Sequence, residues 1–361
     1  MAFGASKSEW SELYVFLRLL GEGKLYMGNH RGEKNDRSFW PISTIERVDN
    51  EGPRRYFIEE EMVRVEGKGD FIKLNRIALT AMADKVLALI KSSGEEDIEC
   101  PEDIEKFLDQ TKIYQLEPET SDRTDLKIGF WSEANIPSGF VIQSRLAPAR
   151  MLLDGGRAAN LKMELSGVRL ANPEVANINA IETNETVRDR LLEIDRLGGV
   201  LKYNDVADKV FRCNLQMIDL HFARILAEML RSFHLDGKSR IYEIMNVIKT
   251  QNPVKVKEDL IQKHRFYEYK MKEFLMAIVR GMRPAKIFNG EHSAVEGMIL
   301  VNGNGDVIGY HKNNQDVFED FLYLNTRFVK GSVDKDKYGF IERENGVHYF
   351  KLNAKISLVK R

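Results

Sequence analysis

The residues whose types and spacing best suit chemistry lie in a hairpin that begins at Asp125. Two strand-like segments, residues 125–131 and 139–146, are joined by a loop rich in turn-forming residues. An acid on one strand and polar side chains on the adjoining strand can surround one divalent metal ion. Mg²⁺ favours such a site because it binds one or two carboxylates and keeps waters and phosphate oxygens in its other positions. An aspartate at a strand start is common, however, so the pattern is also typical of a purely structural hairpin.

Other familiar catalytic signatures are absent from the sequence. It holds no Gly-x-x-x-x-Gly-Lys-Ser/Thr phosphate loop, no Gly-x-Ser-x-Gly elbow and no His-Glu-x-x-His helix. Cys100 and Cys213 have no cysteine near them, so we expect neither a zinc site nor a disulfide. His221 falls on an amphipathic segment, where a packed or surface histidine is the simpler interpretation. The hairpin therefore remains the informative feature.

The elements around the hairpin follow from hydrophobic spacing. Ser6 and Glu9 fit a capping box, which predicts a first amphipathic helix ending at Gly21. Alternating runs predict strands between residues 39 and 74, followed by a helix over 77–91. The longest helical patterns cover 214–233 and 255–282, and the turn sequence at 302–306 separates two strands, 298–301 and 307–310. Residues 338–341, 348–352 and 355–358 are expected to form short strands. The chain thus belongs to the α/β class.

Composition sets broad limits on the class of protein. The 361 residues are 43 % hydrophobic and 30 % charged, which excludes collagen-like, disordered and membrane-spanning chains. Glu9, Glu12 and Arg18 interrupt the first apolar stretch, unlike the core of a signal peptide, and no run approaches the roughly 20 apolar residues of a membrane helix. We therefore expect a cytoplasmic protein with no membrane partner.

Charge is balanced overall, at 54 basic and 55 acidic residues, but not locally. Residues 94–122 hold 11 acids and 2 lysines, a pattern typical of a solvated helix face and linker. Residues 249–286 hold 10 basic and 4 acidic residues with interleaved aromatics, which fits either a phosphate-binding helix or a core helix with a charged outer face. Between residues 145 and 169, five basic side chains face two acids. The overall balance therefore does not argue against a nucleic-acid partner.

Several short segments occur in the same order as in one known family. Residues 8–15, SEWSELYV, are similar to a Gly-Glu-Trp-Ser-Glu-x-Tyr-Val opening, and 124–128, TDLKI, to an Asp-Ile strand. Residues 139–146, GFVIQSRL, are similar to Gly-Phe-Ser-Ile-Lys-Ser-x-Leu, and 151–160, MLLDGGRAAN, to Leu-Leu-Asn-x-Ser-x-x-Thr-Asn. Residues 269–275, 281–284, 309–311, 321–326 and 352–356 follow later landmarks. Across nearly its whole length, the chain resembles the HpaII family of type II restriction endonucleases.

The resemblance implies a PD-(D/E)xK nuclease fold, with a mixed central sheet, flanking helices and additional C-terminal β elements. It implies Mg²⁺-dependent cleavage of both strands of double-stranded DNA at a short palindrome, which for the namesake enzymes is CCGG. Asp125 would then bind the metal from the first strand, and Glu12 would supply a second carboxylate from the first helix. Glu9 ranks lower because the capping box already accounts for it.

The sequence departs from the family pattern at Gln143. The family carries a lysine there, which would orient or activate the attacking water, whereas a glutamine is neutral and can only position that water. An active nuclease with Gln143 as a catalytic residue is our first interpretation. A sequence-specific DNA-binding protein with a degenerate or slow site is the second, and a structural protein without a nucleic-acid role is the third.

The remaining predictions concern DNA contact and organisation. Arginine can bridge the acceptors of a guanine, and asparagine can meet base edges. An interpretation of these arginines as ordinary surface residues is equally favoured. The candidates for DNA contact are Ser144, Arg145, Arg150, Arg157, Asn160, Lys270 and Lys272. We expect a nuclease core over 1–205 and a helical and β-rich remainder over 206–361 that helps to clamp DNA. A palindromic site favours a homodimer.

Overall fold

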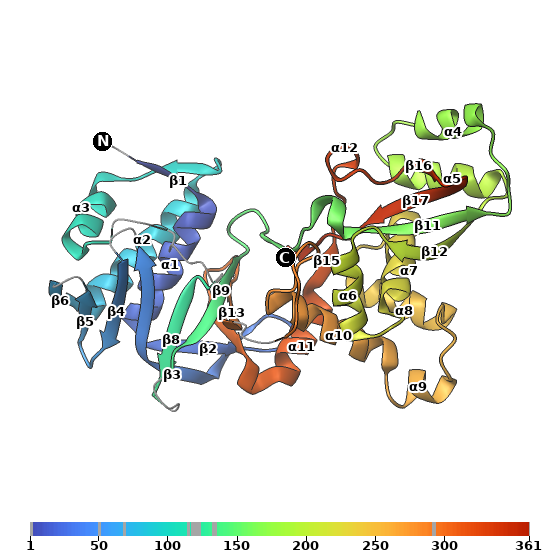
Figure 1. Cartoon of the computed structure of the whole chain (residues 1–361). Coiled ribbons are helices and arrows are strands. Elements are labelled where there is room, and N and C mark those ends of the chain that lie inside the picture. Colours follow the sequence, from blue (N-terminus) through green and yellow to red (C-terminus); the bar gives the residue numbers. More distant parts are fainter. Residues whose placement is uncertain are drawn as a thin grey trace. The chain divides into compact units, whose positions relative to one another are not determined.

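The computed structural model describes residues 3–49, 52–67, 70–113, 116, 124–131, 136–290 and 294–360 (Figure 1). Contacts divide the chain into two compact units. Unit 1 takes in Met1–Arg150, His292–Phe321 and Lys360–Arg361, and unit 2 takes in Met151–Glu291 and Leu322–Val359. Each unit is therefore assembled from segments far apart in the sequence. The roles expected for residues 1–205 and 206–361 stay a prediction.

Unit 1 is built on a nine-stranded sheet in the order β2-β14-β13-β9-β8-β3-β4-β5-β6. The sheet is mixed, because β13 is parallel to β9 and β14 is parallel to β2, while the other neighbours are antiparallel. This confirms an α/β chain with a mixed central sheet. The strands are β2 (Lys24–Gly28), β3 (Lys34–Asp49), β4 (Gly52–Ile58), β5 (Met62–Gly67), β6 (Asp70–Asn75), β8 (Leu126–Phe130), β9 (Ser138–Ser144), β13 (Val295–Val301) and β14 (Val307–His311).

An additional pairing between β2 and β3 closes six of these strands into a ring. The closure depends on the length of β3, which has 16 residues. Its first half pairs with β2 up to Pro41, and its second half pairs with β8 and β4. Register shifts between Tyr26 and Met27 and between Ile42 and Thr44 accompany the change of partner. Such shifts bend strands and increase their twist, which allows a sheet to close. Hydrophobic patterns alone did not predict this closure.

Aromatic rings from three strands, β3, β8 and β9, pack around His311 on β14. Its imidazole centroid lies 5.6 Å from that of Phe140 and 6.0 Å from those of Trp40 and Phe130. His311 is fully buried, and its Nε2 lies 3.1 Å from the Ser138 hydroxyl oxygen. The Phe140 ring leaves no room for a side chain at position 297 on β13, which explains the glycine there.

Two helices of unit 1 confirm the sequence patterns. α1 (Lys7–Glu22) starts in the expected capping box, in which the Ser6 hydroxyl accepts from the Glu9 N–H while the Glu9 carboxylate accepts from the Ser6 N–H and hydroxyl. It ends at Gly23, whose φ of 63° is left-handed. α1 is almost wholly buried and packs against α2 (Arg76–Ser92). Unit 1 also holds β1 (Gly4–Ser6), β7 (Asp97–Glu99) and α3 (Glu102–Thr111).

The acidic stretch over 94–122 is described only in part. Its described section contains β7 and α3, and the three acids Glu102, Asp103 and Glu105 lie in the first turn of α3, where they interact favourably with the helix dipole. Glu117, Glu119 and Asp122 lie outside the described residues.

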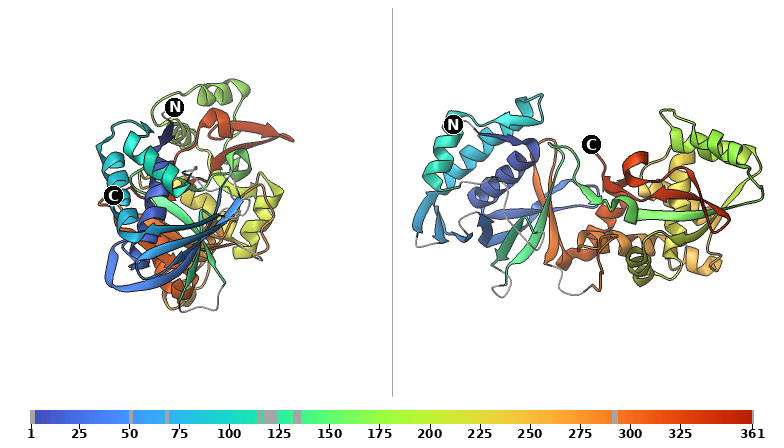
Figure 2. Two further views of the ribbon diagram at one scale, coloured as in Figure 1. Left: turned by 90° about the vertical axis from the view of Figure 1, so that its left-hand side faces the viewer. Right: turned by 45° about the horizontal axis from the view of Figure 1, so that its top comes forward.

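Unit 2 combines two small antiparallel sheets with helices (Figure 2). One sheet has the order β12-β11-β17-β16 and the other β10-β18-β15. The strands are β10 (Met151–Leu153), β11 (Asn160–Ser166), β12 (Val200–Val206), β15 (Thr326–Phe328), β16 (Ile341–Glu344), β17 (Val347–Asn353) and β18 (Ile356–Leu358). The helices are η1 (Gly156–Ala159), α4 (Asn172–Asn179), α5 (Thr186–Arg196), α6 (Lys209–Ile218), α7 (Phe222–Leu235), α8 (Ile241–Gln251), α9 (Glu258–Gln262), α10 (Phe266–Val279) and α12 (Val333–Asp336). Unit 1 also includes η2 (Lys312–Asn314), and α11 (Gln315–Asn325) runs from unit 1 into unit 2.

Both long helical patterns were wrong as single helices. The pattern over 214–233 is split between α6 and α7, because Asp219 leaves the helical conformation and its carboxylate accepts the His221 N–H at 2.9 Å. The pattern over 255–282 is split between α9 and α10 at Arg265, which has a left-handed φ of 50°. Hydrophobic periodicity continues across each break, so it did not reveal either one.

The strand expected over 338–341 begins only at Ile341, whereas the expected strands over 348–352 and 355–358 correspond to β17 and β18. The hairpin of β13 and β14 is confirmed. Within the described ranges, no helix has the length and apolar character needed to cross a bilayer.

We predict that Gly297→Ala destabilises unit 1. A Cβ at Gly297 would lie 2.3 Å from the Phe140 ring and 2.6 Å from the Tyr310 carbonyl oxygen, whereas one at Gly303 meets nothing within 4 Å. Overpacking of this kind costs about 1–3 kcal/mol, and Gly303→Ala should stay within about 0.5 kcal/mol of wild type. Urea unfolding measures the free energy of unfolding of both variants. Equal stability of the two variants would contradict the tight packing around Phe140.

Candidate active site

Asp125 lies immediately before β8, in the hairpin that the sequence predicted. β8 and β9 are antiparallel, with Leu126 opposite Phe140. The Asp125 N–H donates to the Phe140 carbonyl oxygen at 2.8 Å, and its Oδ2 accepts the N–H of Ile142 at 2.6 Å. The side chain is therefore fixed from the backbone of β9. Asp125 is 6 % exposed.

Glu12 reaches the same place from α1. Ser11, its neighbour on the helix, accepts a hydrogen bond from Ser144 on β9 at 3.0 Å, which ties the helix to this hairpin. Glu12 is 7 % exposed, whereas the carboxylate of Glu9 is used by the capping box. Of these two glutamates on α1, Glu12 is thus the one whose carboxylate is directed to the hairpin.

Arg150 joins the two carboxylates. Its Nη1 lies 3.0 Å from Oδ2 and 3.2 Å from Oδ1 of Asp125, and 3.7 Å from Oε1 of Glu12. Both acids therefore converge on one atom. The Glu12 and Asp125 side chains are each 8 % exposed, but that of Arg150 is 49 % exposed. The acids are held in place, while the arginine reaches them from the solvent side.

Burial dominates the electrostatics of this pair. Desolvation raises the pKa of Asp125 above its usual value, and the positive charge of Arg150 together with the Ile142 N–H opposes that rise. An ionised Asp125 therefore needs a cation beside it. Arg150 supplies one, and a divalent metal would supply another.

The donor set fits Mg²⁺. In the part of the chain that the structure describes, no group of three or more His, Cys, Asp and Glu side chains is placed to hold a metal ion. Mg²⁺ commonly binds through one or two carboxylates and takes waters and phosphate oxygens as its remaining ligands. Asp125 and Glu12 are such a pair, and the half-exposed Arg150 can move away from them. They are the residues that would hold the ion.

Gln143 lies on β9, beside Leu300 of β13, and is 6 % exposed. Because side chains alternate along a strand, Gln143 points to the face opposite that of Ile142 and Ser144. Its amide makes no hydrogen bond to any residue that the structure describes. The amide is therefore not committed to a structural contact.

The other candidates for DNA contact have varied surroundings. Ser144 bonds to Ser11, and the Arg145 guanidinium donates to Asn302 at 2.7 Å, so both make contacts inside unit 1. In unit 2, Arg157 is exposed on η1, and the Lys270 ammonium donates to the Ile218 carbonyl oxygen at 3.0 Å.

Two further candidates lie in unit 2. Asn160 is 2 % exposed and hydrogen-bonded on its amide, and Lys272 is half-buried on α10. α10 buries Tyr267 and Phe274 completely, as expected of a core helix with a charged outer face. DNA contact by these residues stays a prediction.

Sequence reasoning missed how the site is assembled. It assigned Arg150 to DNA, whereas the structure places its guanidinium on the two carboxylates. It did not anticipate the Ile142 N–H on Asp125 or the Ser11 contact that anchors α1. The one signal available was chemical, since two acids on buried elements require a compensating charge.

Comparison with known proteins identifies the family of this chain. Residues 6–358 match the family model described as HpaII restriction endonuclease, a span that includes Glu12, Asp125, Gln143 and Arg150. The chain belongs to the HpaII restriction endonuclease family. Over 361 residues it is 27 % identical to "Type II restriction enzyme HpaII" of Haemophilus parainfluenzae, covering 98 % of each chain. No solved structure matches. Membership in the family confirms the resemblance of the short segments.

We predict that Arg150→Ala destabilises the protein in a pH-dependent way. A carboxyl group whose pKa is raised in the folded state favours folding at low pH, and this contribution is lost as the pH rises through the folded pKa. Without Arg150 the pKa of Asp125 rises further, so the loss of stability is largest at mildly alkaline pH, about 1–2 kcal/mol, and shrinks on acidification.

Denaturant unfolding at acidic and alkaline pH measures this, with the exposed Arg31→Ala as the control. A loss that is independent of pH would show that Arg150 does not compensate Asp125.

Proposed function

We propose that this protein is a Mg²⁺-dependent type II restriction endonuclease that cuts both strands of DNA at a short, CCGG-like palindrome. The observation that carries the proposal is the convergence of two buried carboxylates, Glu12 and Asp125, on one position in a chain of this family. Burying two acids side by side costs free energy of folding, even with an arginine that reaches them from solvent. Stability alone therefore does not account for this arrangement. The two acids and the arginine suit a site that binds a metal ion and a phosphate.

Each residue has a definite task in this proposal. Asp125 and Glu12 would hold Mg²⁺, which would supply charge that polarises the phosphate and makes a water more acidic. Arg150 leaves the carboxylates and pairs with the scissile phosphate, for which a guanidinium is well suited. Gln143 accepts a hydrogen bond from the attacking water and so orients it. Hydrolysis then forms a bond from that water oxygen to phosphorus as one ester P–O bond breaks. The attacking water releases its proton to solvent, and the leaving ester oxygen takes a proton from solvent.

The same proposal includes a PD-(D/E)xK core. Asp125 at the start of one strand and Gln143 on the antiparallel neighbour correspond to the acid and the lysine position of that motif. The closed six-stranded ring is an elaboration around this hairpin. A palindrome is read most simply by two identical subunits, so we propose a homodimer that acts on DNA in the cytoplasm.

A DNA-binding protein with a degenerate site is the second candidate. One observation favours it: a neutral glutamine stands where the family carries a lysine. This candidate predicts specific binding of DNA without cleavage, so it is separated from the first by the experiment below.

Cleavage of plasmid DNA tests the proposal. We predict discrete Mg²⁺-dependent fragments that EDTA abolishes, and a loss of at least about 100-fold in rate for Asp125→Asn and Glu12→Gln, since each removes a metal-binding oxygen. Glu9→Gln on the same helix is the matched control, and it should retain the rate while losing some helix stability.

Equal loss in Glu9→Gln and Glu12→Gln would contradict the assignment of Glu12. Sequence-specific binding without cutting by wild type would favour the second candidate.

A further inference from the structure

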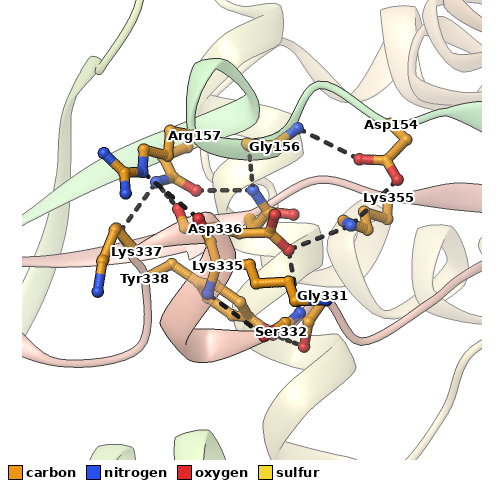
Figure 3. Close-up of polar contacts among 12 residues, drawn as sticks. Asp154, Gly156, Arg157, Gly331, Ser332, Lys335, Asp336, Lys337, Tyr338 and Lys355 are labelled. Atoms are coloured by element: carbon orange, nitrogen blue, oxygen red, sulfur yellow. Dashed lines mark hydrogen bonds and ion pairs between the residues drawn. The ribbon is translucent and has the colours of Figure 1, made fainter.

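A buried polar network in unit 2 joins η1 to α12, two segments far apart in the sequence (Figure 3). The Asn160 amide donates to the carbonyl oxygens of Asp336 at 2.8 Å and Lys337 at 3.0 Å. The Asn353 amide donates to the Gly156 carbonyl oxygen at 2.8 Å and to Asn160 Oδ1 at 2.7 Å. Both asparagines are 2 % exposed. Their amides are therefore used to hold backbone carbonyls together.

A second set of contacts fixes the end of α12. The Asp336 carboxylate accepts the Ser332 N–H at 3.0 Å and pairs with Lys355 at 3.1 Å. Lys355 also pairs with Asp154 at 3.1 Å. A Cβ at Gly331 would lie 2.4 Å from the Asp336 carboxylate, so this approach requires glycine. Lys355 thus pairs with both aspartates, and its one positive charge balances one of their two negative charges.

The network holds Lys337 in an uncommon backbone conformation. Its φ is 52°, in the left-handed region that costs free energy for residues other than glycine. Such a conformation persists only where surrounding contacts impose it, and here Asn160 binds the Lys337 carbonyl. Lys337 is also the residue that ends α12, where a left-handed conformation is common, and its side chain is exposed.

Arg157 and Lys337 are brought together at the surface by this network. Both are exposed, and the Nε of Arg157 donates to the Lys335 carbonyl oxygen on α12 at 3.4 Å. In Figure 3 their charged ends lie on the same side of the network, away from the Asp154 and Lys355 pair. Across the network, the four basic residues Arg157, Lys335, Lys337 and Lys355 outnumber the three acids Asp154, Asp334 and Asp336 by one. The result is a small basic corner.

We propose that this η1–α12 corner, presenting Arg157 and Lys337, contacts the phosphate backbone of DNA. The inference rests on the proposed function, whose substrate is a polyanion, and it adds Lys337 as a contact. Asn160 acts in it as a positioning residue and not as a reader of base edges, because its amide is already bonded within the protein. Contacts to phosphate set affinity and register without reading sequence.

The test is the salt dependence of DNA binding by the full-length protein, measured by fluorescence anisotropy on a cognate and a scrambled duplex in EDTA. Between about 50 mM and 200 mM salt, loss of one phosphate contact lowers the slope of log affinity against log salt by about 0.9. We expect that change for Arg157→Ala and for Lys337→Gly, equally on both duplexes. Glycine removes the charge and keeps the left-handed backbone. Lys337→Arg keeps the positive charge and should therefore keep the wild-type slope. Lys238→Ala, which removes another exposed lysine, is the control and should also keep it.

Asn160→Ala tests the positioning role. If Asn160 acts through Lys337, Asn160→Ala should not change the slope further in a protein that already carries Lys337→Gly. If Asn160→Ala instead causes a general loss of structure, its effect should add to that of Lys337→Gly. If the wild-type protein binds DNA and the slopes of Arg157→Ala and Lys337→Gly equal the wild-type slope, this inference is overturned. The proposed function is then left intact. A wild-type protein that neither binds nor cuts DNA overturns both.

Discussion

The confinement of two carboxylates around a single cation is the constraint on which the rest of unit 1 depends. Glu12 and Asp125 are both less than a tenth exposed, and burial raises the pKa of Asp125. Keeping such acids ionised requires a positive charge within a few ångströms. Arg150 meets that requirement in this structure, and because its side chain is half exposed it can yield the position to a metal ion.

The scaffold brings the two acids together from separate elements of unit 1. Asp125 is fixed by the backbone of β9, within a ring of strands that β3 closes. Glu12 is fixed by α1, whose N-terminus is capped by Ser6 and whose middle is bonded to β9 through Ser11. A small shift of the helix would separate the acids, so the near-complete burial of α1 serves the site as well as stability. Rigid support of this kind keeps reacting groups at the right distance.

The sequence predicts those parts of the fold and of the candidate site that depend on interactions between residues close together in the chain. The capping box of α1, the Asp125 hairpin and the turn between β13 and β14 depend on residues within a few positions of one another. The six-stranded ring depends on β2 meeting β3 and on β13 meeting β9, pairings that no local pattern encodes. The breaks at Asp219 and Arg265 were hidden because the hydrophobic spacing continues through them. Arg150 was recognised as basic, but its partner could be found only in three dimensions.

Binding of Mn²⁺, a spectroscopic substitute for Mg²⁺, is the most direct measurement of the central claim. Electron paramagnetic resonance of the full-length protein should show binding that strengthens as the pH rises and Asp125 ionises. Binding should be lost in Asp125→Asn and Glu12→Gln and kept in Glu9→Gln. Undiminished Mn²⁺ binding by the first two variants would show that the ion is held elsewhere and would contradict the account.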